Sequence, residues 1–331
     1  MEVLVLSEAD VYRTLPMRDC IGVMREALGA LATGDAYAPL RMVVRLPDGS
    51  GLLAIMPGQM SGGDGARPAL GMKAVAIFPG NAARGIDTHQ GAVLLLDADT
   101  GRLSAVMDAA AVTAIRTAAV SALATDLLAR KDAQDLAILG AGVQARTHLE
   151  AIAAVRPLRR ARVWSRTAER AHNLVTEERH RYAFPVEAVP TAEAAVREAD
   201  IIVTVTASPE PVLLGAWVRR GAHVNAVGSA LPTARELDTA CVCAARIFVD
   251  RRESALAEAG DLLIPIREGA LRPEQIVGEL GQVVTGQVVG RRSDDELTLF
   301  KSLGLAVEDV AAAAFVVRRA QDARAGTRVP M

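Results

Sequence analysis

The segment "LAILGAGVQARTHLEAI", residues 136–152, constrains the fold of this chain more than any other stretch. A short apolar run predicts a β-strand, and the residues after Gly142 have the apolar spacing of a helix. Gly140, Gly142 and Ala145 stand between them as G-x-G-x-x-A. The first glycine permits a tight turn, the second lets the backbone approach a pyrophosphate, and the alanine lets the helix pack closely on the sheet. The pattern predicts a dinucleotide-binding turn, and an ordinary tight turn is the alternative. The expected contacts are Gly140, Ala141, Gly142, Val143 and Gln144.

The residues after the next strand-like run indicate which dinucleotide is bound. An NAD site usually ends this strand with Asp or Glu, whose carboxylate accepts hydrogen bonds from the ribose. Here the chain reads Ser165-Arg166-Thr167, with Arg170 one turn further on. A guanidinium binds phosphate through two parallel hydrogen bonds, and hydroxyl groups donate as well. We therefore predict NADPH, with NADH as a possible second cofactor. The alternative is that Arg166 is an ordinary solvated residue, although the helix dipole disfavours a cation at a helix start.

The pattern of segments predicts two domains, in keeping with a length of 331 residues. Residues 18–34 have helical spacing, and strand-like segments without intervening helices follow up to residue 97, which predicts an antiparallel or mixed sheet. An alanine-rich helix begins near Asp108. After it, short apolar strands alternate with helices, as in a parallel sheet that is covered on both faces. We expect the last helix, residues 306–323, to pack back on the first domain.

Composition argues against several classes of partner. The net charge of −2 provides no attraction for nucleic acid. No signal peptide is recognisable, and no apolar run approaches the length needed to cross a bilayer. Cys20, Cys241 and Cys243 lack the companion ligands of a zinc site, so we expect buried small hydrophobic residues in a reducing cytoplasm. We predict a cytoplasmic protein without a metal, a nucleic-acid partner or a membrane partner.

Three cations lie in apolar segments of the sequence: Arg41, Lys73 and Arg116. A buried cation costs several kcal/mol unless it is paired. The sequence offers few carboxylates near these residues, so an anionic ligand is the expected partner. Alternatively, each side chain reaches solvent along its alkyl stem.

The whole chain resembles the ornithine cyclodeaminase/mu-crystallin family. The resemblance implies an α/β fold in which a Rossmann-like doubly wound parallel sheet is inserted in an α+β substrate-binding and dimerisation domain. It places the α+β domain in residues 1–115 plus 309–331, places the NAD(P)-binding domain in residues 116–308, and implies a homodimer. The stretches that carry it are "GMKAV", "DTHQGAVLLLDADTG", "AVTAIRTAAVSALA", "LGAGVQA", "ADIIVTVT", "NAVGS", "RELD", "EAGDL" and "FKSLGLAVED".

The resemblance also implies a set of site residues. Arg41, Lys73 and Arg116 match the positions at which the family holds the carboxylate of a small amino or imino acid, and Ala230 lies at a substrate position. The remaining matches are cofactor positions: Thr117, Val205, Thr206, Gly228, Ser229, Lys301, Ser302 and Leu303.

The chain departs from ornithine cyclodeaminases at two positions. Those enzymes carry an acid where this chain has Ala54 and another where it has Ala230. The chain is more similar to the mu-crystallin-like ketimine reductases of the family. The resemblance therefore implies NADPH-dependent reduction of a cyclic ketimine, such as Δ1-pyrroline-2-carboxylate or Δ1-piperideine-2-carboxylate, to the L-amino acid. Lys73, with a pKa lowered by desolvation between two arginines, is a candidate proton donor. His89, acting through water, is the alternative donor, although a lone histidine beside a turn is more often structural.

Three other functions stay open. The first is an ornithine cyclodeaminase or an alanine-type amino-acid dehydrogenase on the same scaffold. The second is reduction of an acyclic imine such as iminosuccinate, whose second carboxylate would need another cation, with Arg45 and Arg84 as candidates. The third is a non-enzymatic role in binding NADPH or a small ligand.

Overall fold

The computed structural model describes residues 2–62 and 68–331. Its contacts divide the chain into two compact units. The first unit comprises Met1–Arg116 and Gly304–Met331, and the second comprises Thr117–Leu303.

The first unit is built on a mixed sheet, as the run of consecutive strand-like segments predicted. β1 and β7 are parallel, and the other neighbouring pairs are antiparallel. Consecutive strands explain the antiparallel part, because a chain that turns back after a strand can pair directly with that strand. The strands, in spatial order, are β16 (Thr327–Pro330), β1 (Glu2–Leu6), β7 (Leu103–Asp108), β6 (His89–Leu96), β5 (Ala69–Ile77), β4 (Leu52–Met60) and β2 (Ala36–Tyr37), with β3 (Met42–Arg45) also paired to β4.

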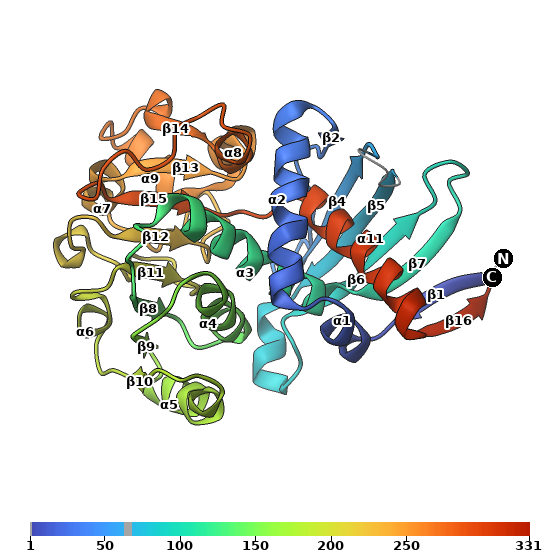
Figure 1. Cartoon of the computed structure of the whole chain (residues 1–331), viewed down its shortest axis with the longest axis horizontal. Coiled ribbons are helices and arrows are strands. Elements are labelled where there is room, and N and C mark those ends of the chain that lie inside the picture. The colour runs from blue at the N-terminus through green and yellow to red at the C-terminus, as the bar shows by residue number, and fades with distance from the viewer. Residues whose placement is uncertain (1, 63–67) are drawn as a thin grey trace. The chain divides into compact units, whose positions relative to one another are not determined.

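Two long helices accompany this sheet, α2 (Met17–Thr33) and α11 (Ala306–Ala323). α11 contacts β4, β5, β6 and α2, and Figure 1 shows α2 and α11 crossing the strands. Ten residues of α11 are buried, most of them alanine and valine, whose small side chains allow close packing on the strands. The prediction that the last helix packs on the first domain is therefore confirmed. The shorter α1 (Glu8–Thr14) and the 3₁₀ helix η1 (Pro79–Arg84) complete the unit.

The sequence patterns missed six of the described elements of this unit: α1, β1, β2, η1, β7 and β16. Each is short, and two of them lie at the chain termini. β1 and β16 pair with each other through residues at opposite ends of the chain, so no local pattern reveals them. Figure 1 shows the two termini side by side at this edge of the sheet.

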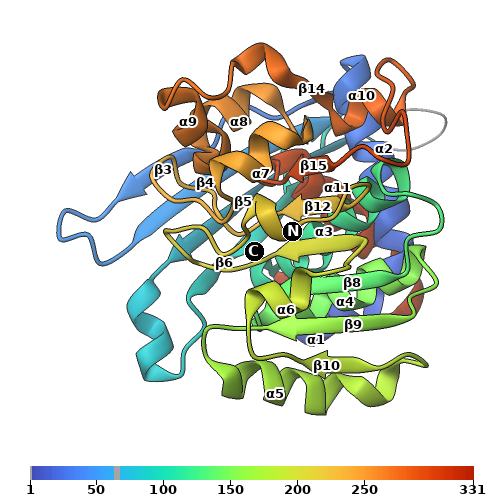
Figure 2. The same cartoon turned by 90° about the vertical axis from the view of Figure 1, so that its left-hand side faces the viewer.

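The second unit contains a fully parallel sheet, which confirms the doubly wound α/β prediction. β8 lies between β9 and β11, so the strand order reverses direction at β8, as in dinucleotide-binding folds. Figure 2 shows β8, β9 and β10 one below another, with α5 beside β10. The strands, in spatial order, are β10 (Val186–Ala188), β9 (Arg160–Trp164), β8 (Asp135–Leu139), β11 (Ile201–Thr204), β12 (His223–Ala226), β15 (Thr298–Lys301), β13 (Arg246–Val249) and β14 (Ile276–Glu279).

The helices of the second unit follow the strands closely along the chain. Every residue of β8, β11 and β12 is buried, which is why these strands read as continuous apolar runs. β14 and β15 were not recognised in the sequence.

The helices of this part of the chain lie between the strands in sequence. They are α3 (Ala109–Leu128, which spans the boundary between the units), α4 (Val143–Val155), α5 (Ala168–Glu178), α6 (Ala192–Val196), α7 (Thr239–Ala244), α8 (Arg252–Glu258), α9 (Gly260–Arg267) and α10 (Leu280–Val284), with the 3₁₀ helices η2 (Arg179–Arg181), η3 (Gly215–Trp217) and η4 (Pro273–Gln275).

Two expectations from composition need correction. By length and composition alone, α3 could cross a membrane. This is contrary to our expectation that no apolar run approaches the length needed to cross a bilayer. Of its most apolar window, 83% is buried inside the protein, as in a central core helix. Cys20 and Cys241 are buried as expected, but Cys243 is exposed. Cys241 and Cys243 are two residues apart on α7, so they lie on opposite sides of that helix.

Candidate active site

The glycine turn has the geometry that its sequence predicted. Gly140 has a φ of +128°, and an added Cβ would lie 2.7 Å from the carbonyl oxygen of Val205, so its own fold requires glycine there. Ala145 is fully buried under the sheet. Gly142 is the N-cap residue of α4. It differs from Gly140, because a Cβ added at Gly142 would meet nothing within 4 Å. The packing of the protein does not explain this glycine, and its contact with a phosphate stays a prediction.

The surroundings of this turn also fit a pyrophosphate. Among the described residues no side chain caps the N-terminus of α4, and Val143 is exposed in its first turn. An uncapped helix N-terminus beside open space is the usual place for a bound phosphate.

The predicted ribose-binding residues follow β9. Ser165 is half-buried, and its hydroxyl accepts a hydrogen bond of 3.3 Å from the amide of Thr167. Arg166, Thr167 and Arg170 are exposed. Within residues 2–62 and 68–331, the side chains of Arg166 and Arg170 form no hydrogen bond or ion pair. Both guanidinium groups are therefore available to an anion in solution.

The turns after β11 and β12 are tied together by Glu236, a buried residue that the sequence did not single out. Its carboxylate accepts hydrogen bonds from the amides of Thr206 (2.6 Å) and Gly228 (2.7 Å), and from the hydroxyls of Thr204 and Thr206. An added Cβ on Gly228 would lie 2.1 Å from the carbonyl oxygen of Thr206, so only glycine fits there. These contacts hold together the predicted cofactor residues Val205, Thr206, Gly228 and Ser229. The only signal in the sequence was the family stretch "RELD".

A second buried acid, Asp261, supports this arrangement. Its Oδ1 accepts from the amides of Glu236 (2.7 Å) and Leu237 (3.0 Å), and its Oδ2 lies 2.9 Å from Nζ of Lys301. Burial raises the pKa of Glu236, and the Asp261 charge raises it further. The ammonium group of Lys301 is completely buried against Asp261, so its side chain serves the fold directly. Ser302 and Leu303 are buried beside it, with their amides bonded to Ala226 and Asp250.

The three predicted cations gather in the first unit, where two carboxylates join them. We call Arg41, Lys73, Arg116, Glu308 and Asp309 the cation cluster. Lys73 on β5 is 2% exposed and Arg116 on α3 is 4% exposed. Nζ of Lys73 lies 2.9 Å from Oδ1 of Asp309 and 3.2 Å from Oγ1 of Thr113. Nε of Arg116 lies 2.9 Å from the same Oδ1, and its Nη1 lies 2.7 Å from Oε2 of Glu308.

These ion pairs correct the expectation that carboxylates are scarce near the cations. Glu308 and Asp309 lie in the first turn of α11, about 200 residues after Arg116, and both are completely buried. The helix that packs across the sheet brings them to β5 and α3. The side chains nevertheless retain donors for a ligand: Arg116 has no acceptor for Nη2 among the described residues.

Gly304 gives the cluster its close packing. Its φ is +80°, and an added Cβ would lie 2.3 Å from Nη1 of Arg116. Its carbonyl oxygen accepts a hydrogen bond of 3.0 Å from Nη2 of Arg41. Arg41 directly precedes β3, and β3 pairs with β4. β4 also pairs with β5, where Met56 lies opposite Lys73. Gly304 thus joins Arg41 to Arg116, a role that was not apparent from the sequence.

The pKa of Lys73 is lowered to about 8, as we predicted in direction. Burial is the main cause, the charges of Arg116 and Arg41 lower it further, and Asp309 opposes them. His89 lies on β6, where its Nδ1 is 3.0 Å from Oγ1 of Thr88. Partial desolvation lowers the pKa of His89, and the Lys73 charge adds to that effect. His89 forms no hydrogen bond with Lys73 in the described part of the chain.

The strand register places several predicted residues on the Lys73 face of the sheet. Ala54 pairs with Val75, which lies two residues from Lys73, and Ile77 pairs with His89. Arg45 pairs with Leu52, which pairs with Ile77. Because side chains alternate along a strand and directly opposed residues share a face, Ala54, Arg45 and His89 all lie on that face.

Three further predicted residues lie elsewhere in the fold. Arg84 is exposed at the end of η1. Thr117 is buried on α3, next to Arg116 in the chain. Ala230 lies in the loop after β12 and packs against the core of the second unit.

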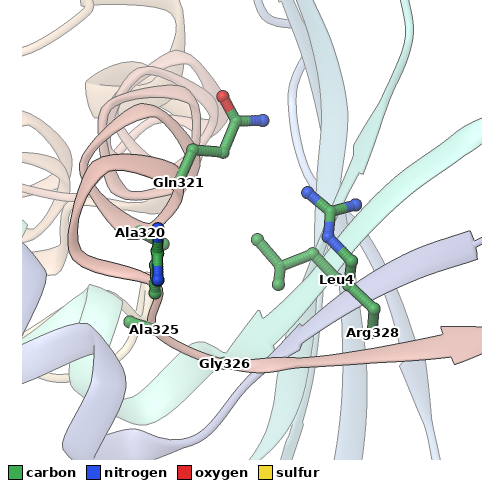
Figure 3. A pocket seen from close by; sticks show the side chains of 7 residues that line it. Leu4, Ala320, Gln321, Ala325, Gly326 and Arg328 are labelled. Carbon is green, nitrogen blue, oxygen red and sulfur yellow. The ribbon is translucent and has the colours of Figure 1, made fainter.

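A surface pocket of the first unit lies at the other end of α11 from the cation cluster. It has a volume of about 240 Å³ and is shown in Figure 3. None of the predicted site residues lines it, so it has no part in the proposed chemistry. Its walls are formed by Leu4, Ala320, Gln321, Arg324, Ala325, Gly326 and Arg328.

Comparison with known proteins identifies the family of this chain. It is 36% identical over 327 residues to a Delta(1)-pyrroline-2-carboxylate reductase of Bacillus cereus, covering 98% of this chain and 99% of that protein. It is 41% identical over 283 residues to the ketimine reductase mu-crystallin of Mus musculus, covering 86% and 85%. The solved structure of Thermococcus litoralis Delta(1)-pyrroline-2-carboxylate reductase in complex with NADH and L-proline matches with a TM-score of 0.95 and 36% identity, covering 99% of this chain and 100% of that one.

The model of the ornithine cyclodeaminase/mu-crystallin family matches residues 1–324, almost the whole chain. The match includes both units and all the stretches on which the resemblance was based. The chain belongs to the ornithine cyclodeaminase/mu-crystallin family.

Proposed function

We propose that this protein uses NADPH to reduce a small cyclic α-imino acid, Δ1-pyrroline-2-carboxylate or Δ1-piperideine-2-carboxylate, to the L-amino acid. The broader assignment, an NAD(P)H-dependent reductase of C=N bonds in imino acids, has the support of the named relatives. One observation carries the proposal: the buried cation cluster retains donors on Lys73 and Arg116 that no described residue accepts.

The charges of the cluster favour a monocarboxylate. Three cations and two carboxylates leave a net charge of +1, which a single substrate carboxylate neutralises. Each charge-assisted hydrogen bond to that carboxylate contributes roughly 1.5–3 kcal/mol. A dicarboxylate such as iminosuccinate would leave one negative charge to be paired elsewhere on the same sheet face, where Arg45 lies.

The reaction needs one hydride and one proton. NADPH, when bound, supplies the hydride to C2 of the imine. The protein must orient the carboxylate, exclude water and deliver a proton to the nitrogen, so that C=N becomes CH–NH. Lys73 suits the proton transfer because its pKa, about 8, lies near neutral pH. The ammonium group becomes a neutral amine in this step and regains its proton from solvent before the next turnover.

The preference for NADPH rests on the end of β9. No carboxylate occupies residues 165–167, directly after Trp164, and the guanidinium groups of Arg166 and Arg170 pair with no residue that the structure describes. The 2′-phosphate of NADPH fits a guanidinium pair, whereas NADH has no anion there. The glycine turn and α4 would hold the pyrophosphate, and the turns clamped by Glu236 would lie at the carboxyl ends of the strands, where such folds bind ligands.

Cyclodeamination is disfavoured by the residues at two positions of this chain. It needs an acid to manage the second nitrogen of a diamino acid. Ala54, on the Lys73 face, and Ala230, after β12, provide only methyl groups. The proposal therefore assigns reduction, without release of ammonia.

We also propose that the protein is a homodimer that pairs through the first unit. Large apolar side chains on and near β2, β3 and β4 are exposed, and such patches often mark protein–protein interfaces. A second copy would cover them. They are Tyr37, Leu40, Met42, Val43, Val44, Leu46 and Leu53. A cytoplasmic location, and the absence of nucleic-acid or membrane partners, stay predictions.

The test of the reaction is a substrate panel followed by the absorbance of the reduced nicotinamide at 340 nm. Purified protein is mixed with NADPH or NADH and with pyrroline-2-carboxylate, piperideine-2-carboxylate, iminosuccinate, or pyruvate with ammonia. Consumption with a cyclic imine, and identification of L-proline or L-pipecolate, would support the proposal. Ammonia release from ornithine with catalytic NAD would instead indicate a cyclodeaminase. No turnover, with nucleotide binding retained, would indicate a binding protein.

A further inference from the structure

We propose that Asp309 is a positioning residue that orients the ammonium group of Lys73, so that a single N–H remains directed to the substrate. This inference rests on the proposed function, because it deepens the role of Lys73 in the same site. Asp309 lies on α11 and is assigned no contact with the substrate. It acts through the two cations that it binds.

The hydrogen bonds of Lys73 can be counted. A lysine ammonium has three N–H donors. Asp309 Oδ1 accepts one at 2.9 Å, and Thr113 Oγ1 accepts a second at 3.2 Å. Within the described residues the third has no acceptor. Two acceptors from two different helices therefore determine the direction of the remaining donor, which a flexible lysine stem would not do unaided.

Asp309 also couples Lys73 to Arg116. The same Oδ1 atom accepts from both cations at 2.9 Å, while Oδ2 is buried without a hydrogen-bond partner among the described residues. All of its charged contacts are thus made through one atom shared by the two substrate-binding residues. Movement of that carboxylate would shift the carboxylate anchor and the proton donor together.

Several charged or titratable groups face Lys73 from the surrounding elements. Asp309, from α11, stabilises the ammonium form. Arg116 from α3 and Arg41 beside β3 destabilise it. The charge of Lys73 lowers the pKa of His89 on β6. Glu308 pairs with Arg116 and makes no hydrogen bond to Lys73. Removal of the Asp309 charge should therefore favour the neutral amine of Lys73.

Replacement of Asp309 by Asn removes the charge with little change in size. The matched control is Glu308→Gln, which neutralises the neighbouring buried acid of the same cluster. We expect Asp309→Asn to move the basic limb of kcat/KM for the imine down by about one pH unit, as loss of a close opposite charge does. Glu308→Gln should raise KM through Arg116 and leave that limb near the wild-type pH. An unshifted limb in Asp309→Asn would overturn the proposal.

Lys73 can also be observed without any substrate, because the chain has three lysines: Lys73, Lys131 and Lys301. Protein labelled with ¹³C at lysine Cε should give three NMR signals, of which Lys131→Arg assigns one and Lys73→Arg another. In the wild type, the Lys73 signal should titrate near pH 8. It should titrate about one pH unit lower in Asp309→Asn and unchanged in Glu308→Gln. Equal titration in all three proteins would overturn the link between Asp309 and Lys73.

A second variant tests position separately from charge and remains informative if Asp309→Asn fails to fold. Asp309→Glu keeps the charge but displaces the carboxylate by one methylene. We expect Lys73 to titrate near its wild-type pH, while kcat falls roughly tenfold or more because the donor is displaced. A wild-type kcat would overturn the positioning role. If the wild type reduces no imine, the proposed function fails, whereas the NMR titration still decides whether Asp309 governs Lys73.

Discussion

Nζ of Lys73 lies 2.9 Å from Oδ1 of Asp309, a residue 236 positions further along the chain. This ion pair is completely enclosed, with side-chain exposures of 3% and 0%. A buried cation bound to a buried acid is costly to separate, since either group left alone would be an uncompensated charge. The ion pair therefore fixes the position of the Lys73 ammonium group relative to a bound substrate.

Removal of Lys73 tests its role in proton transfer. We expect Lys73→Ala to lower kcat at least 100-fold, roughly the low end of what a general acid contributes, while NADPH still binds. Rates measured by absorbance, and nucleotide binding measured by fluorescence, separate these effects. The control is Lys131→Ala, which removes an exposed lysine. Activity retained in Lys73→Ala would exclude the lysine from the mechanism.

The nucleotide preference is tested at Arg166. We expect Arg166→Ala to raise KM for NADPH about tenfold or more, since a charge-assisted contact to phosphate is lost. KM for NADH should stay the same, because NADH has no phosphate at that position. Arg102→Ala, at another exposed arginine, should change neither value. Equal effects on the two nucleotides would contradict the assignment of the 2′-phosphate.

The pKa of Lys73 predicts how the reaction depends on pH. It is lowered from the ordinary lysine value to about 8, so the ammonium donor is present below that pH and is lost above it. In the direction of reduction, kcat/KM should therefore fall above about pH 8, by about tenfold per pH unit. Oxidation of the amino acid needs the neutral amine and should rise over the same range. Residual activity of Lys73→Ala should lack this limb, and a limb that persists would assign the titration to another group.

The clamp formed by Glu236 should control nucleotide affinity. Each carboxylate oxygen accepts from a backbone amide, Oε1 from Thr206 and Oε2 from Gly228. In Glu236→Gln, either orientation of the side-chain amide sets an N–H against one of those donors, which costs about 1–3 kcal/mol. We expect a lower Tm and a weaker Kd for NADPH by about tenfold. Isothermal calorimetry and thermal unfolding measure these changes, with Glu274→Gln as the exposed control. Wild-type nucleotide affinity would show that the clamp serves stability alone.

The proposed dimer surface is tested at Val44, which is 51% exposed on β3. A carboxylate at this position should prevent two apolar surfaces from associating, because a buried unpaired charge is strongly unfavourable. We expect Val44→Asp to be a monomer in analytical ultracentrifugation at micromolar concentration. Val289→Asp, at another exposed valine, should leave the dimer intact. A wild-type monomer would refute the proposal, and a dimeric Val44→Asp protein would exclude this surface.

Local patterns in the sequence were enough to identify most of the second unit. The apolar run that begins the 136–152 segment was predicted as a strand, and it is β8; in the first unit, the final helix α11 was predicted at its observed bounds. The features that revealed them act over a few residues: alternation or helical spacing of apolar side chains, and glycines where the backbone turns. The need for Gly140 could be read in the same way, because its tight turn is a local demand.

Elements that depend on distant partners were not readable. β1 and β16 exist as a pair only because the ends of the chain meet. β15 is a strand because it pairs with β12 on one side and β13 on the other, and β14 is a strand because it pairs with β13 at the edge of the sheet. Such short segments have little preference of their own, and their neighbours in the sheet decide their conformation.

The candidate site divides in the same way. The unusual positions of Lys73 and Arg116 in apolar segments were visible in the sequence, since a cation among apolar residues needs a partner. The identity of that partner was decided by α11, which brings Glu308 and Asp309 to β5 and α3 from the far end of the chain. The chemistry of a single side chain can be read directly from the sequence. The ion pair between Lys73 and Asp309 spans 236 positions and forms only when α11 packs on the sheet, so only the folded structure shows it.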